Sequence, residues 1–280
     1  MNRENARRLV IGTLREKGFD HAVLEADILC VKAFGCSRES LLAHLEEVVT
    51  PPQEETLFSL LEARLQREPV AYLKGSTSFW GMDILVGPGC LIPRPETETL
   101  VEKALDLFQG GKFADWGTGS GCISLSILSE RPTARGLLLE KSPAALMWAW
   151  RNLSRSPFLN RALLWHGSSL GSIPSSWKPF DLIVANPPYI PSSEMETLMP
   201  DVRLYEPSEA LDGGPDGLDD IRAILADADT VLARGGFLLL EIGSPQQAES
   251  LLNSPAGNLE PVKVEKDLSG KDRVVVWRHR

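Results

Sequence analysis

The chain has few of the residues that build metal centres and disulfide frameworks. Its four cysteines and four histidines are scattered along 280 residues, and no two cysteines have C-x-x-C spacing. The sequence therefore predicts no metal site and no disulfide scaffold, and it fits a reducing compartment. It also lacks an apolar run long enough to cross a membrane and a signal-like hydrophobic segment near Met1. We therefore expect a cytoplasmic protein that does not engage membranes.

An excess of positive charge is missing as well. The chain has 29 Lys and Arg against 38 Asp and Glu, a formal net charge of −9. Proteins that hold duplex nucleic acid neutralise its phosphates with surplus Lys and Arg, so the composition argues against that partner. What is present is a globular composition, 43% hydrophobic and 24% charged, in a chain long enough for two domains. Nothing in the sequence indicates the oligomeric state, and a monomer is the default expectation.

The pattern of apolar residues divides the chain into three parts. Residues 1–75 carry helical periodicity and predict a bundle of about four helices. Residues 76–94 contain an aromatic and β-branched run followed by Gly87-Pro88-Gly89, which predicts a β-hairpin linker. In residues 95–280 strand segments alternate with helical segments, as in an α/β domain with a mostly parallel sheet covered on both faces.

Seven strands and several helices are expected in the third part. Only a short turn joins the last two strands, so they should form an antiparallel hairpin at the sheet edge, which makes the sheet mixed. The expected strands are 112–116, 136–140, 162–165, 181–185, 236–242, 261–266 and 273–278, and the clearest helices are 121–129, 143–153 and 217–233.

The most informative segment is Asn186-Pro187-Pro188-Tyr189, which follows the apolar run 181–185. The first proline forces Asn186 out of the helical region, and the two prolines keep the loop from winding into a helix. A stiff turn thus holds an amide, a backbone carbonyl and an aromatic ring at the carboxyl end of a strand, where α/β sheets bind ligands. This set suits a planar –NH2 group, which needs two acceptors and a flat surface beside it. The alternative to a binding site is an ordinary loop that follows a strand.

A glycine-rich loop from Asp115 to Gly121 follows the first expected strand and opens a helix. Glycines let a ligand approach the backbone, and a helix N-terminus offers free N–H groups. The spacing is Gly-x-Gly-x-Gly, unlike a dinucleotide or P-loop site, and the carboxylate of Asp115 would repel a pyrophosphate but suit the sulfonium amino acid of S-adenosylmethionine. A glycine-rich turn without a ligand is the alternative. The predicted cofactor-binding residues of this loop are Asp115, Gly117, Thr118, Gly119, Ser120 and Gly121.

Three further features lie at the ends of expected strands. Glu140 ends the strand 136–140, where an acid can accept hydrogen bonds from both ribose hydroxyls. Ser168, after the third strand, could contact the edge of an adenine, although an ordinary loop serine is the simpler interpretation. A long turn-rich segment, 206–218, has the character of a lid, and solvated turn residues are the alternative.

Taken together, these segments resemble the HemK/PrmC family, the N5-glutamine methyltransferases that modify peptide chain release factors. Asn-Pro-Pro-Tyr is shared with adenine-N6 DNA methyltransferases, whereas Ile-Pro-Arg-Pro-Glu-Thr-Glu at 92–98 and the helical N-terminal part are far more specific. The segments that carry the resemblance are 67–73 with Gly75, 79–81, 92–98, 115–121, 186–191, 206–207, 211–218 and 241–243.

The resemblance implies a class I, Rossmann-like methyltransferase domain behind a helical substrate-docking domain, with S-adenosylmethionine as the cofactor. The implied substrate is the glutamine in the Gly-Gly-Gln loop of a release factor. By motif, the three loop glycines hold the methionine part of the cofactor, Glu140 holds the ribose, and Asn186 to Tyr189 hold the glutamine amide. The chain departs from the family at Ser168-Ser169, where an Asp–aromatic pair is usual near the adenine.

The expected catalytic set is Asn186, Pro187 and Tyr189. Asn186 Oδ1 and the Pro187 carbonyl would accept the two N–H groups of the amide and align its lone pair with the methyl. Pro188 and Tyr189 would complete the substrate site, with the Tyr189 ring packed on the substrate side chain, and Asn186 would also border the cofactor.

Two other functions stay open on the sequence alone. One is an adenine-N6 nucleic-acid methyltransferase, in which Tyr189 would stack on a flipped base. The 10 Lys and Arg against 12 Asp and Glu in residues 1–75 argue against it, because this part is no basic recognition module. The other is a protein that senses the cofactor without catalysis, for which an amide clamp would have no purpose.

Overall fold

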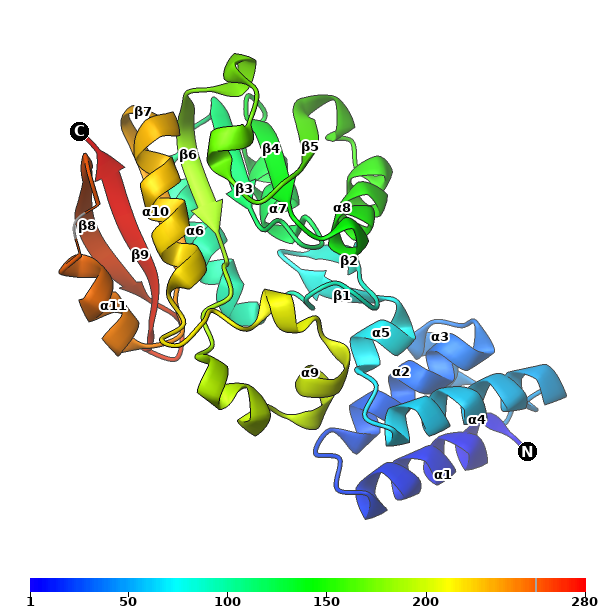
Figure 1. Cartoon of the computed structure of the whole chain (residues 1–280). Coiled ribbons are helices and arrows are strands. Elements are labelled where there is room, and N and C mark those ends of the chain that lie inside the picture. Colours follow the sequence, from blue (N-terminus) through cyan, green and yellow to red (C-terminus); the bar gives the residue numbers. More distant parts are fainter. Residues whose placement is uncertain (255) are drawn as a thin grey trace. The chain divides into compact units, whose positions relative to one another are not determined.

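The computed structural model describes residues 1–254 and 256–280, which form two compact units (Figure 1). The first unit combines Met1–Ser76 with Met199–Tyr205, and the second combines Thr77–Leu198 with Glu206–Arg280. No helix in the described part of the chain combines the length and the apolarity that a bilayer crossing requires.

The first unit is a helical bundle. Its core joins apolar side chains of successive helices, among them Val10, Leu29 and Leu57. Ser37 caps the third helix, since its hydroxyl accepts a hydrogen bond from the Ser40 backbone N–H at 3.1 Å. The helices are α1 (Arg3–Glu16), α2 (Ala22–Phe34), α3 (Arg38–Ala43), α4 (Pro51–Leu65), α5 (Val70–Lys74) and α9 (Pro200–Tyr205).

The prediction of about four helices in residues 1–75 misses α5. Pro69 stands at its N-cap with extended backbone angles, and Gly75 ends the helix at a φ of 89°. A proline after a helical run is a usual sign that the helix ends, but it is equally suited to the start of a new helix.

Arg64 of α4 joins two other segments of the helical unit, and its loss is expected to destabilise that unit. The side chain is 5% exposed and binds Glu25 of α2 and Asp201 of α9, each at 2.8 Å. Arg64→Met would leave two largely buried carboxylates without this partner, so we expect the free energy of unfolding to fall by about 3 kcal/mol. Chemical denaturation monitored by circular dichroism measures this change.

The matched control is Arg8→Met. Arg8 pairs with Glu4 at 2.6 Å, but these side chains are 72% and 50% exposed. A pair of this kind contributes at most about 1 kcal/mol. Equal losses in the two variants would show that burial of the Arg64 pair has no energetic consequence.

The second unit is built on a seven-stranded sheet, which confirms the predicted fold class. The strand order is β5-β4-β3-β6-β7-β9-β8. The first five strands in this order are parallel, whereas β9 runs antiparallel to both β7 and β8 and forms the predicted edge hairpin with β8. The strands are β3 (Lys112–Trp116), β4 (Arg135–Glu140), β5 (Ala162–His166), β6 (Phe180–Ala185), β7 (Leu232–Glu241), β8 (Leu259–Lys266) and β9 (Asp272–His279).

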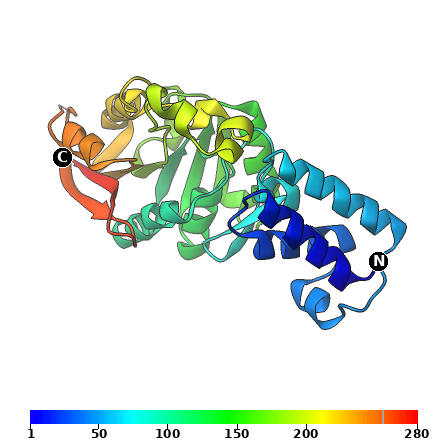
Figure 2. The same ribbon diagram turned by 90° about the horizontal axis from the view of Figure 1, so that it is seen from below.

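Helices cover both faces of this sheet. Side chains alternate between the faces along a strand, so Leu137 and Leu139 of β4 pack in the core beneath α10 and α11, while Leu138 lies near Gly121 and Ala149 on the other face. Figures 1 and 2 show α10 and α6 on opposite sides of the strands. The helices are α6 (Glu98–Leu107), α7 (Cys122–Glu130), α8 (Pro143–Arg155), α10 (Asp219–Val231) and α11 (Pro245–Leu252).

The structure corrects the expected elements at two points. The strand expected at 236–242 begins at Leu232, and the helix before it ends at Val231 rather than at 233. Helix α11 was not predicted, although Ser244 caps it and Pro245 occupies its first turn, which is a standard signal for a helix start.

A two-stranded hairpin of β1 (Ser76–Phe79) and β2 (Met82–Leu85) forms within the predicted linker, but its turn lies inside the aromatic and β-branched run rather than at Gly87-Pro88-Gly89. Its two-residue turn holds Trp80 and Gly81 at φ values of 50° and 71°, the left-handed conformation that tight hairpins require. The carboxamide of Asn152 on α8 binds both backbone groups of Leu85, at 2.8 and 2.9 Å, and so anchors β2 to the methyl-transfer domain predicted from the sequence.

Candidate active site

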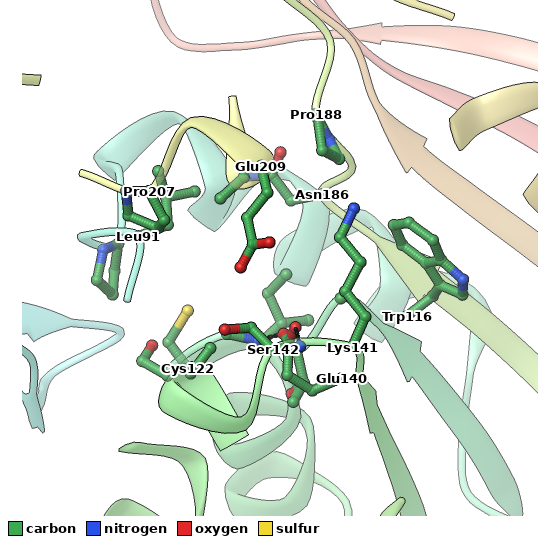
Figure 3. A pocket seen from close by; sticks show the side chains of 18 of the residues that line it. Leu91, Trp116, Cys122, Glu140, Lys141, Ser142, Asn186, Pro188, Pro207 and Glu209 are labelled. Carbon is green, nitrogen blue, oxygen red and sulfur yellow. Dashed lines mark hydrogen bonds between the residues drawn. The ribbon is translucent and has the colours of Figure 1, made fainter. Parts of the chain in front are cut away.

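A pocket of about 810 Å³ opens at the carboxyl ends of β3, β4, β5 and β6 (Figure 3). The chain builds β4 and β5 on one side of β3 and then crosses to β6 on the other side, and ligands bind at this kind of switch in α/β sheets. The strand ends contribute the segments 116–120, 140–142, 167–168 and Asn186 with Pro188, and the segments 89–97 and 207–210 complete the walls.

The glycine-rich loop forms the floor. Gly117, Gly119 and Gly121 have φ values of 66°, 58° and 82°, which side chains with a Cβ rarely adopt. The loop lines the pocket from Gly117 to Ser120, and Gly121 stands at the N-cap of α7. This is the strand–loop–helix context in which backbone N–H groups are offered to a ligand.

Asp115 lies beneath the loop rather than on the wall of the pocket. It is fully buried, and its Oδ2 accepts hydrogen bonds from Thr118 Oγ1 and Ser124 Oγ, both at 2.7 Å. Burial raises the pKa of Asp115 to about 6, although these two hydrogen bonds favour the charged form. The sequence analysis expected Asp115 beside the cofactor; in the structure its visible contacts are those that hold the loop to β3 and α7.

Glu140 connects the loop to the next strand. Its Oε2 accepts a hydrogen bond from the Gly119 N–H at 2.9 Å, and its Oε1 accepts one from the Ser142 N–H at 2.8 Å. Burial raises the pKa of Glu140, while these backbone donors lower it. The carboxylate lines the pocket, and the two backbone N–H groups fix its position. A carboxylate fixed in this way is suited to accept hydrogen bonds from ribose hydroxyls.

The charges around the pocket suit a cation rather than a phosphate. Two basic residues line it, but Lys141 pairs with Asp220 at 3.7 Å and Arg94 pairs with Glu206 at 2.5 Å. Glu209 points its carboxylate into the cavity in Figure 3. Among the described residues that line this pocket, a pyrophosphate would meet carboxylates without a cationic partner and no unpaired basic side chain, whereas a sulfonium nucleoside would be attracted.

Glu206 holds the cover of the pocket in place. It is 5% exposed, and besides the Arg94 pair its Oε2 accepts the Ile92 N–H at 3.0 Å. These contacts join the segment 92–94 to the segment 206–210. The two segments that cover the pocket are therefore fixed to each other. The sequence analysis marked both segments but gave no reason for them to meet.

Asn186 stands where two pockets meet. It lines the large pocket and also a neighbouring one of about 290 Å³, which Pro187 and Tyr189 line as well. The Nδ2 group of Asn186 donates to Thr97 Oγ1 at 3.0 Å, and within the described structure its Oδ1 accepts no hydrogen bond. An unused acceptor therefore lies between the two cavities.

Tyr189 lines only the smaller of these two pockets. Its hydroxyl donates to Glu241 Oε1 at 3.3 Å, and its ring lies against Gly243, where an added Cβ would come within 2.7 Å. Burial raises the pKa of the Tyr189 phenol above its usual range. The hydroxyl is thus turned to the protein interior, and only part of the ring can face a substrate.

Several residues of the site have no counterpart in the sequence analysis. Trp116 forms a wall, and its indole N–H donates to the Ser168 carbonyl at 2.9 Å, so Ser168 lies at the pocket through its backbone as well. Trp116 stands directly before the first loop glycine, and this position in the sequence could have identified it as a residue of the pocket wall. Among the residues described, no group of three or more His, Cys, Asp or Glu side chains is arranged to hold a metal.

The fold and the pocket define a class I methyltransferase that uses S-adenosylmethionine. The catalytic domain of hMettl16, solved with a hairpin of the MAT2A 3′ UTR, has this fold, with a TM-score of 0.55 and 13% identity over 81% of this chain and 82% of that one. That likeness concerns the fold alone.

The family follows from closer relatives. A model of the PrmC N-terminal domain matches residues 5–75, and one of the methyltransferase small domain matches residues 95–206. The release factor glutamine methyltransferase of Rhodospirillum rubrum is 39% identical over 269 residues, 95% of this chain and 82% of its own. The enzyme of the same name from Cereibacter sphaeroides is 39% identical over 281 residues, 99% of each chain. The chain belongs to the release factor glutamine methyltransferase family.

Proposed function

We propose that this protein transfers a methyl group from S-adenosylmethionine to the side-chain nitrogen N5 of the glutamine in the Gly-Gly-Gln loop of a peptide chain release factor. The observation that carries the proposal is the position of Asn186, which is shared by a large pocket suited to a cationic nucleoside and a smaller pocket beside it. A carboxamide in the smaller pocket would meet the free Oδ1 of Asn186 while facing the methyl donor in the larger one.

The residues of the large pocket fit S-adenosylmethionine. Gly117, Gly119 and Gly121 would hold its methionine part, Glu140 would bind the ribose hydroxyls, and Ser168 would border the adenine. The carboxylates that face this pocket complement a positive charge, which supports the assignment. When bound, the cofactor supplies the electrophilic methyl group and the sulfonium leaving group.

The residues around the smaller pocket would activate the amide by position. A glutamine nitrogen is a weak nucleophile because its lone pair is delocalised into the carbonyl. Asn186 Oδ1 and the Pro187 carbonyl would accept its two N–H groups, orient the lone pair and stabilise the positive charge that develops on nitrogen. Pro188 and Tyr189 would confine the substrate side chain, and the released proton would pass to water.

The helical domain, residues 1–75, is proposed to dock the release factor. A net charge of −9 supports a protein rather than duplex nucleic acid as the partner. We further propose that the enzyme works in the cytoplasm as a monomer.

Mass spectrometry tests the proposed function directly. We expect a purified release factor, incubated with the protein and S-adenosylmethionine, to gain the mass of one methyl group on the glutamine of Gly-Gly-Gln. A release factor in which that glutamine is replaced by glutamate is the matched control and should gain nothing. An unmodified wild-type release factor, or labelling of adenine in a parallel DNA sample, would contradict the proposal.

A further inference from the structure

Thr97 is a buried polar residue in contact with Asn186. It is 2% exposed and ends the short 3-10 turn Pro95–Thr97, directly before α6. Its Oγ1 accepts the hydrogen bond from Asn186 Nδ2 at 3.0 Å. A carboxamide has one donor end and one acceptor end, so a partner for the donor end determines which way the acceptor faces.

The proton of the Thr97 hydroxyl has a candidate acceptor in Glu241, at the end of β7. Glu241 is fully buried, and its Oε2 has no close hydrogen-bond partner in the described structure. The Thr97 hydroxyl favours the charged form of this carboxylate, which makes it a candidate donor to Glu241. Because a hydroxyl has a single proton, a threonine that directs it to Glu241 can only accept from Asn186.

We propose that Thr97 is a positioning residue, which together with the Glu241 carboxylate holds the Asn186 carboxamide with its oxygen directed at the substrate amide. This inference rests on the proposed function of Asn186. Thr97 and Glu241 are the residues that keep Asn186 Oδ1 directed at the substrate. Without Thr97 the carboxamide can turn, and its –NH2 group would then oppose the N–H groups of the glutamine.

The charge of Glu241 decides the direction of this hydrogen-bonded chain. Burial raises the pKa of Glu241 to about 7. A protonated Glu241 could donate to Thr97 and leave the threonine proton for Asn186 Oδ1, which would occupy the acceptor that the substrate needs. Four other ionisable groups interact electrostatically with Glu241, so that one affects the pKa of the other. They are Glu96 before Thr97, Cys122 of α7, Tyr189 after β6 and Arg273 of β9.

The decisive variants are Thr97→Val, which keeps the shape without the hydroxyl, and Thr97→Ser, which keeps the hydroxyl. We expect Thr97→Val to lower kcat for release-factor methylation about tenfold, while the dissociation constant for S-adenosylmethionine changes less than about twofold. Thr97→Ser should restore most of the turnover. Thr99→Val is the matched control, because Thr99 is also buried, at 7% exposure, in the first turn of α6 and lines neither pocket.

A readout independent of turnover follows the Asn186 side chain itself. In protein labelled with ¹⁵N-asparagine, the side-chain amide signal of Asn186, identified by its loss in an Asn186 variant, should shift and exchange faster in Thr97→Val than in Thr97→Ser. Thermal unfolding and cofactor binding by calorimetry establish that each variant is folded.

The pH profile tests the part played by Glu241. Since the carboxylate is the form that sets Asn186 correctly, wild-type kcat should fall as the pH is lowered through about 7, and this inflection should be absent in Glu241→Gln. Wild-type turnover in folded Thr97→Val, equal losses in Thr97→Val and Thr97→Ser, or an unchanged inflection in Glu241→Gln would each overturn the proposal. Failure of the wild-type enzyme to methylate a release factor would instead overturn the proposed function.

Discussion

Asn186→Ala is expected to lower kcat for release-factor methylation about 100- to 1,000-fold, the usual cost of removing one transition-state contact. The variant removes the unused acceptor between the two pockets, so the glutamine amide would lose one of its two alignment contacts. Cofactor binding should change little, because the large pocket keeps its glycine loop and Glu140. Single-turnover methylation, with calorimetry for the cofactor, separates the two effects.

The matched control for this prediction is Asn160→Ala, which removes an exposed carboxamide that lines neither pocket. It should methylate at the wild-type rate. Wild-type turnover in Asn186→Ala would remove Asn186 from the mechanism, and a loss confined to cofactor binding would assign it to the cofactor site instead.

Glu140→Gln is expected to weaken S-adenosylmethionine binding about 10- to 100-fold, because hydrogen bonds to a charged group are worth about 1.5 to 3 kcal/mol. Both carboxylate oxygens of Glu140 accept backbone N–H groups, from Gly119 and from Ser142. A glutamine has only one acceptor oxygen, so its –NH2 group would oppose one of these donors and disturb the floor of the pocket. Calorimetric titration with the cofactor measures the change.

Glu62→Gln on the exposed side of α4 is the control for the change of charge, and it should bind the cofactor normally. If Glu140→Gln retains the wild-type dissociation constant while its fold is intact, then Glu140 neither shapes the loop nor contacts the ribose, and the cofactor site has been assigned to the wrong strand end.

Local patterns were enough to predict the strands of the sheet and the hairpin at its edge. The strand 112–116 is found with those bounds, and the hairpin of β8 and β9 follows from a five-residue turn with no helical pattern. Buried strands are continuous apolar runs, and their signal depends only on neighbouring residues. Helix α11 escaped prediction because its eight residues are a weak periodic signal, although its cap was readable.

Site residues were harder to place from sequence than strands. Gly119 and Glu140 were marked separately, but their direct hydrogen bond could not be foreseen, because the twenty-odd residues between them form α7 and β4. Asp115 was expected at the ligand on grounds of charge, and its hydrogen bonds with the hydroxyls of Thr118 and Ser124 were not foreseen. A buried carboxylate seeks such donors wherever the fold provides them.

The class of sheet, the glycine loop and the rigid turn after Asn186 were predictable from the amino-acid sequence, because each of these depends on residues adjacent in the chain. Only the folded chain brings Thr97 into hydrogen-bond contact with Asn186, allows the Thr97 hydroxyl to favour the charged form of Glu241, and makes the two pockets share this asparagine. The physical reason is that the direction of a carboxamide depends on hydrogen-bond partners brought together by packing, which no local pattern specifies.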